Sequence, residues 1–186
     1  MVQKSVLTDG VTNPMSAWTS QTTATGQKTG GIFSGQYLCS PVKYAPSTQT
    51  TFTASSATMA AVSSGVICTG AFKAPPSGCV IVGISFVAQY SAGAGFAIGL
   101  ALTGTTTMIG NPVVPRFSGT GINNTFNMPI AVMGLTSGSS YNFDLMYCMT
   151  TSDTFTITAY AQSPGTTPSL GSTGQGAPVV MTVQGI

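Results

Sequence analysis

Charged side chains are almost missing from this sequence of 186 residues. It has five Lys or Arg, three Asp or Glu and no His, so 4% of the residues are charged, against about a quarter in typical soluble domains. The few cations are scattered, which excludes nucleic-acid binding because phosphate neutralisation needs clustered Lys and Arg. Ser, Thr, Asn, Gln and Gly must supply the solubility, and such a surface repels its neighbours weakly. The composition therefore favours a chain that associates readily or packs into an assembly.

Glu and His are both absent, so the common groups of acid–base and nucleophilic catalysis are missing. The β-rich part of the chain holds two carboxylates, Asp144 and Asp153. In the hairpin register given below they are about 17 Å apart along the strand, whereas a glycosidase needs two carboxylates roughly 5–9.5 Å apart. The run GAGFAIG has no helix after it, unlike a phosphate-binding loop. We expect no enzymatic activity, no catalytic residues and no cofactor.

Metal-ligand spacing is also absent among the four cysteines, Cys39, Cys68, Cys79 and Cys148. No pair has CxxC spacing, and without His a zinc site would need all four thiolates from unrelated places. The segment after Lys4 has no apolar run of the secretory type. We therefore expect a reducing compartment, no metal site, and cysteines that are unpaired and buried.

Long apolar stretches are missing from residues 1–50, where Thr, Ser, Gln and Gly predominate without a period. Such a segment cannot by itself bury enough surface to offset its ordering entropy, but it can order along a partner. We predict an extended N-terminal arm over residues 1–50, with Trp18, Ile32 and Phe33 as its anchors on that partner. The alternative is a floppy tail.

From residue 51 onward, the pattern is one of short strands between turns, with no convincing helical period. This predicts a single β-sandwich or barrel domain over residues 51–186. Residues 80–102 have the length of a membrane span, but QYSAGAG lies at their centre, and two strands fit better. The candidate strands are 51–54, 58–63, 66–73, 79–89, 95–103, 107–114, 125–134, 140–149, 153–161 and 178–185.

Two hairpins are predicted from coinciding apolar faces. With TTS (150–152) as the turn, Tyr147 lies opposite Phe155 and Leu145 opposite Ile157. A turn at AGA (92–94) likewise sets Phe86 opposite Leu100. Residues 79–87, CVIVGISFV, are apolar on both faces, so we expect this strand to be covered on both sides.

Two phrases of the sequence resemble the jelly rolls of the C1q and tumour-necrosis-factor families. FKAPPSGCVIVGISF (72–86) is similar to their F-x-A-P-x-x-G-x-Y-x-F strand–turn–strand. MPIAVMGLTSGSSYNFDLMY (128–147) is similar to their later L-x-x-G-D-x-V-x-V strand, with Ser139 in place of the acidic residue. Similar phrases occur in small virion proteins of tailed bacteriophages, among them capsid decoration and minor tail proteins. The resemblance covers at most residues 66–161. The matching residues are Phe72, Ala74, Pro75, Gly78, Phe86, Leu135, Gly138 and Tyr141.

The resemblance implies an all-β, jelly-roll-like antiparallel β-sandwich with an N-terminal arm, and an immunoglobulin-like sandwich is the alternative. It also implies a homotrimer located in a virion that is assembled in the host bacterial cytoplasm. The expected function is a capsid decoration protein that binds the major capsid protein, without contact to nucleic acid or membrane. The alternative function is a tail or fibre-tip module that recognises a host surface sugar.

Overall fold

A computed structural model describes residues 36–90, 95–115, 123–149, 153–161 and 176–186. These residues form twelve strands and no helix, so the all-β prediction is confirmed. No helix in the described ranges is long and apolar enough to cross a membrane. The strands are β1 (Val42–Tyr44), β2 (Thr50–Ala54), β3 (Ala60–Ala61), β4 (Phe72–Lys73), β5 (Val80–Tyr90), β6 (Phe96–Leu102), β7 (Met108–Val113), β8 (Asn124–Val132), β9 (Ser140–Tyr141), β10 (Phe143–Met149), β11 (Phe155–Ala159) and β12 (Val179–Gly185).

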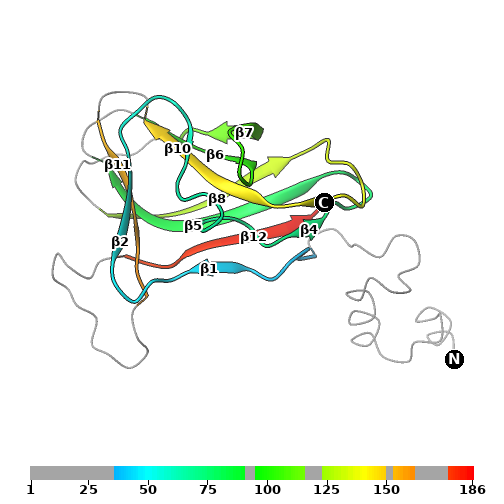
Figure 1. The fold of residues 1–186 in the computed structure, drawn as a ribbon, viewed down its shortest axis with the longest axis horizontal. Helices are drawn as coiled ribbons and strands as arrows, with labels where there is room; N and C mark the ends of the chain where they lie inside the picture. Colours follow the sequence, from blue (N-terminus) through cyan, green and yellow to red (C-terminus); the bar gives the residue numbers. More distant parts are fainter. Residues whose placement is uncertain (1–35, 91–94, 116–122, 150–152, 162–175) are drawn as a thin grey trace, which may run out of the picture.

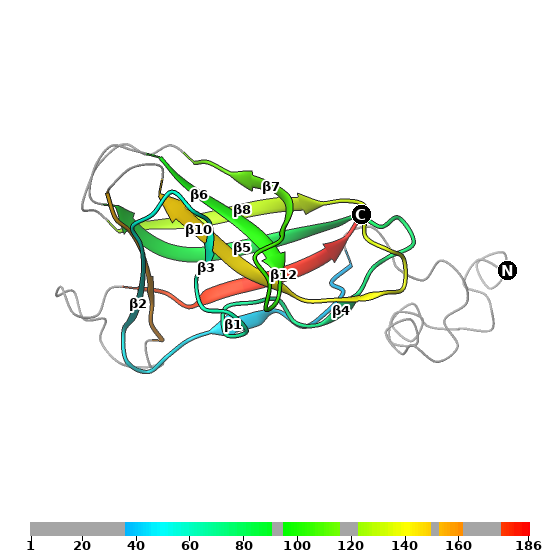
Figure 2. The ribbon, with the colours of Figure 1, turned by 45° about the horizontal axis from the view of Figure 1, so that its top comes forward.

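The strands form two main layers (Figures 1 and 2). The large sheet has the order β1-β12-β5-β11-β2, and β8 pairs with the other side of the long strand β5. The small sheet has the order β3-β10-β6-β7. In Figure 2, β6 and β10 of the small sheet cross in front of β5 and β12. The short strands β4 and β9 pair with each other at one end of the molecule.

The order of pairing identifies the sandwich as a jelly roll. Eight strands build its two four-stranded halves: β1, β3, β5, β6, β7, β8, β10 and β12. The first of these pairs with the last, β1 with β12, and then β3 with β10, β5 with β8 and β6 with β7, all antiparallel. This nested pairing is produced by a folded-over pair of Greek keys. The jelly-roll prediction is therefore confirmed, and the immunoglobulin-like alternative is wrong.

Aromatic rings join the two layers near one end of the core. Phe96 of β6 stacks on Phe155 of β11 with centroids 3.7 Å apart, and Phe86 of β5 stacks on Phe126 of β8 at 5.1 Å. Phe96 also contacts Phe126 edge-to-face at 5.7 Å. Because the two contacts of Phe96 cross between the sheets, they set how the layers pack, and offset or edge-on ring pairs stabilise by about 0.5–1.5 kcal/mol each beyond their buried area.

The predicted hairpin of residues 140–161 is wrong in its pairing. β10 pairs with β6 and β3 in the small sheet, whereas β11 pairs with β2 and β5 in the large sheet. The two strands thus face each other across the core, where Tyr147 contacts Phe155 edge-to-face at 6.5 Å. Their apolar faces do coincide, as predicted, but through stacking of layers rather than hydrogen bonds within one sheet.

The predicted pairing of Phe86 with Leu100 is wrong for the same reason. β5 lies in the large sheet opposite β8, and Phe86 is opposite Phe126. β6 lies in the small sheet, where Leu100 is opposite Leu145 of β10. Both connections cross between layers, and an alternating apolar pattern satisfies a cross-layer contact as well as a hairpin.

The two phrases behind the family resemblance lie against each other in space. Gly78 has a φ of 65° and donates its N–H to Pro75 O at 2.9 Å, which closes a turn, and its carbonyl accepts the N–H of Leu135 at 3.0 Å. Phe72 of β4 pairs with Tyr141 of β9, and their rings are 6.2 Å apart. A Cβ on Gly78 would lie 2.5 Å from Leu135 O, so glycine is required there by both backbone conformation and space.

The described part of the predicted arm, residues 36–50, is hydrogen-bonded into the large sheet. Lys43 of β1 lies opposite Val180 of β12. Further back, the N–H of Leu38 donates to Val183 O at 2.9 Å, and Gly185 N–H donates to Gln36 O at 3.0 Å. This segment therefore completes the sandwich and is not separate from it. The remainder of the predicted arm, residues 1–35, lies outside the described residues.

Candidate interaction surface

The outer face of the large sheet is a regular surface that spans four neighbouring strands, β8, β5, β12 and β1. Residues alternate along β8 between buried and exposed, and the side chains of β12 alternate between buried and half-buried. Strand pairing places the outward residues in rows that run across β8, β5, β12 and the β1 edge. One row is Ala131, Ile81, Gln184 and Tyr37; the next is Pro129, Gly83 and Thr182; the third is Asn127, Ser85, Val180 and Lys43.

Charge is confined to the margin of this face. Lys43 lies at its β1 edge, and none of the other residues in the three rows is ionisable at neutral pH. The other side chains in the described ranges that are charged at neutral pH are Lys73, which is exposed, Asp153, which is half-buried, and Asp144, which is fully buried. A neighbouring molecule could therefore cover this face with little desolvation of charge, which is the costly part of burying a polar surface.

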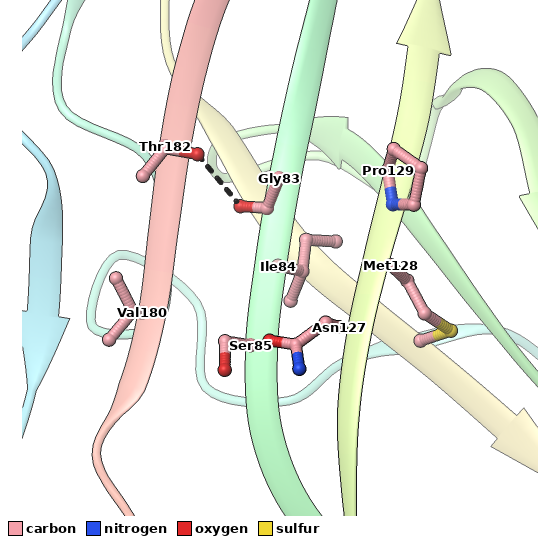
Figure 3. Close-up of a pocket in the computed structure, with 8 residues that line it drawn as sticks. All are labelled: Gly83, Ile84, Ser85, Asn127, Met128, Pro129, Val180 and Thr182. Carbon is pink, nitrogen blue, oxygen red and sulfur yellow. Dashed lines mark hydrogen bonds between the residues drawn. The ribbon is translucent and has the colours of Figure 1, made fainter.

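A shallow depression of about 270 Å³ lies at the centre of the face (Figure 3). Its floor is Gly83, which lies opposite Pro129 on one side and Thr182 on the other. Ser85 and Asn127 supply polar groups at one end. The depression depends on the missing side chain, since a Cβ on Gly83 would lie 2.6 Å from Thr182 Oγ1.

The face becomes apolar toward the end where β5 begins and β8 and β12 finish. Met133 is 73% exposed, Tyr37 53% and Ile186 43%. Val80, at the start of β5, lies opposite both Val132 and Gly185, and the Ile186 N–H donates a hydrogen bond to Cys79 O at 3.2 Å. Met133 and Ile186, which directly follow Val132 and Gly185, therefore lie at the same end of the sheet. We call the group Tyr37, Ile81, Ala131, Met133 and Ile186 the apolar end.

Asp144 is the carboxylate that the structure buries, and it joins two loops to β10. Its Oδ2 accepts hydrogen bonds from Ser64 Oγ at 2.7 Å and from Gly104 N–H at 3.1 Å, and its Oδ1 accepts one from Gly65 N–H at 3.0 Å. Burial alone would raise the pKa of Asp144, but these hydrogen bonds to the charged form outweigh it and lower the pKa. With both oxygens engaged, the group is positioned to hold the loops in place.

The four cysteines are free thiols, of which Cys148 is buried and the other three are half-buried. Burial raises the pKa of Cys39, Cys68 and Cys148, and the Asp144 charge adds to the rise at Cys68. These thiols are therefore protonated at neutral pH and weakly nucleophilic. The expectation of full burial holds for Cys148 alone. The described residues contain no group of three or more metal-ligating side chains.

The site residues predicted from the sequence, Trp18, Ile32 and Phe33, all lie outside the described residues. The structure instead indicates an interaction surface on the sandwich itself. Of this surface, the sequence analysis identified only residues 79–87, the strand that was expected to be covered on both sides. Of this strand, one face is buried in the core, and Ile81, Gly83 and Ser85 on the other are half-buried in the single chain. A further signal was available in TFNMPIAVM (125–133), where small and polar residues alternate with large apolar ones and Pro129 indicates an edge strand.

No family model and no curated protein matches the chain. Among solved structures, it is similar to the infectious bursal disease virus VP2 subviral particle, at a TM-score of 0.36 and 11% identity over 78% of this chain and 36% of that one. It is also similar to structures of the Gx and Gt strains of that virus, at TM-scores of 0.24 and 0.23 and 14% identity, over 77% and 87% of this chain. It covers 35% and 40% of those chains, so it spans well under half of each matched protein. At TM-scores this low, the matches assign neither a family nor a function to the chain.

Proposed function

We propose that this chain is a structural virion protein, a decoration protein that binds the outer face of a phage head as a homotrimer. The observation that carries the proposal is the nearly uncharged outer face of the large sheet, with Lys43 at its margin. A protein that works by covering a repeating surface needs a broad face of low desolvation cost and no reactive group.

Self-association is the first use that we propose for this face. Copies with so few surface charges repel each other weakly, and the half-buried residues Ser85 and Val180 would lose their remaining water contact against a neighbour. The depression over Gly83 would receive a side chain of the neighbouring copy. The major capsid protein would then be contacted by the N-terminal arm, with Trp18 as an anchor.

We also propose that the chain is not an enzyme. Asp144 is fully buried, and its two oxygens accept three hydrogen bonds from within the chain. Asp153 is half-buried at the start of the described range 153–161. Neither arrangement offers a free, paired carboxylate for general acid–base work.

The alternative role, a tail or fibre-tip module for a host sugar, requires aromatic side chains grouped on a loop end. Among the aromatic side chains whose burial the structure describes, the exposed one is Tyr37, which pairs with Gln184 at the sheet end. This observation favours the decoration role over sugar recognition.

The test is the copy number of the chain in purified particles, measured by quantitative mass spectrometry against the major capsid protein. A decoration protein is expected at hundreds of copies per particle, in a fixed ratio to the capsid protein. A handful of copies per particle would contradict the decoration role and favour the tail module. Absence from the particle would overturn the virion assignment altogether.

A further inference from the structure

The apolar end is an exposed hydrophobic patch on a surface that is otherwise polar. Three of the five large hydrophobic side chains that are exposed in the described residues, Tyr37, Met133 and Ile186, belong to it. Ile81 and Ala131 lie in the adjoining row of the same face. Patches of this kind on a soluble chain usually have an occupant.

The polypeptide leaves the described region directly beside this patch. Gln36 is fixed at the edge of the sheet because its carbonyl accepts the Gly185 N–H, and Tyr37, the next residue, is itself part of the patch. Thirty-five residues precede Gln36 in the sequence. The residues just before it are therefore tethered within a few ångströms of the exposed apolar side chains.

The nearest large apolar residues in that preceding segment are Ile32 and Phe33. Three residues of extended chain reach about 10 Å from Gln36 and four reach about 13 Å. The distance from the β1 edge to β8 is three strand spacings, or about 14 Å. Neighbouring residues of an extended chain point to opposite sides, so a consecutive pair presents one apolar side chain to the sheet in either register.

We propose that Ile32 and Phe33 cover the apolar end of their own chain. A link of three residues gives this segment a local concentration in the millimolar range or above, which a second molecule at micromolar concentration does not match. The contact would leave Trp18, farther along the arm, as the aromatic group that remains to bind a partner. The inference does not depend on the proposed virion function.

The test uses the full chain labelled with ¹³C at the methionine methyl groups. The Met133 methyl resonance is assigned with Met133→Leu, and its chemical shift is compared between the natural chain and an Ile32→Ser/Phe33→Ser variant. Met128, which is buried in β8, the strand that ends just before Met133, is the internal control for intact folding. Trp18→Ser is the matched control within the arm.

The expected result is a shift of the Met133 resonance in the double variant, with Met128 unchanged and no shift at Met133 in Trp18→Ser. An unchanged Met133 resonance in the double variant would overturn the proposal. To separate the chain's own segment from a neighbour's, labelled double variant is mixed with unlabelled natural chains in denaturant and refolded. The shift should persist in the mixture. Its reversal would show that the segment of a neighbouring copy covers the patch, and the proposal for the chain's own segment would be wrong.

Discussion

Replacing Asp144 with Asn removes one negative charge from the interior while keeping the shape of the side chain. In the natural chain, Oδ1 accepts from Gly65 N–H, and Oδ2 accepts from Gly104 N–H and Ser64 Oγ. An amide has only one oxygen, so its NH₂ group must face either the Gly65 or the Gly104 N–H, and that backbone donor stays unpaired. Ser64 can rotate its hydroxyl to accept, but a backbone N–H cannot.

The expected loss in the free energy of unfolding is about 2–4 kcal/mol. A hydrogen bond to a charged group contributes about 1.5–3 kcal/mol, and a buried donor left without a partner costs about 1–3 kcal/mol. Partial relaxation of the two exposed loop residues, Ser64 and Gly104, keeps the total below the sum of these values. Urea unfolding at neutral pH measures it. The same change at Asp153, which is half-buried, is the matched control and should cost under about 1 kcal/mol.

The pH dependence supplies a second check with a defined sign. The pKa of Asp144 in the folded chain lies below its ordinary value of 3.8, so the folded state favours the ionised form more than the unfolded state does. The stabilisation is complete above that ordinary value and is lost as the pH falls through the lower, folded pKa. The difference between natural chain and Asp144→Asn should therefore be constant from pH 5 to 8 and shrink in acid below about pH 4. A difference that is absent at pH 7, or that grows as the pH falls, would refute this reasoning.

Three further predictions follow from the fold. Gly78→Ala should lower the free energy of unfolding by about 2–4 kcal/mol, because a left-handed backbone is combined with a Cβ that would lie 2.5 Å from Leu135 O. Gly65→Ala is the control: Gly65 has a φ of 70° but open space around it, so the substitution should cost only about 1–2 kcal/mol. Equal effects of the two substitutions in urea unfolding would contradict the packing argument. Cys148→Ser should cost about 1–3 kcal/mol through burial of a hydroxyl, and intact-mass analysis should show no loss of hydrogens from a cross-link in the natural chain. Removing residues 1–35 should leave a folded sandwich, as judged by a cooperative thermal transition, but weaken attachment to particles sharply; undiminished attachment would show that the arm is only a tail.

The sequence pattern located most strands because alternation of apolar residues is a local property. It placed β5, β6, β7, β8 and β12 within a residue or two of their bounds. It missed β1 because three residues in a polar segment carry no period. What stabilises that strand is its pairing with β12 at the other end of the chain, and no local signal reports such a partner.

Strand pairing and the candidate surface could not be predicted from the local sequence, because both depend on contacts between residues far apart in the chain. Coinciding apolar faces at Tyr147 and Phe155 are compatible with a hairpin or with two stacked layers, and the choice depends on whether the connection crosses the core. The row Asn127, Ser85 and Val180 joins residues far apart in the chain through cross-strand register. Asp144 is buried by loops whose position the strand pattern does not encode.

The most direct test of the central proposal is the mass of the protein in solution, by light scattering at micromolar concentration, for the natural chain and for Asn127→Asp. Asn127 is exposed on the outer face and lines the depression over Gly83, so the substitution should leave the subunit folded but introduce a charge that association would have to bury unpaired. Thr106→Asp, at an exposed turn of the small sheet, is the control. The natural chain and Thr106→Asp should each scatter with three times the 18.8-kDa chain mass, and Asn127→Asp with a single chain mass. A natural chain that scatters as a monomer, or an Asn127→Asp variant that remains a trimer, would contradict the proposed homotrimer.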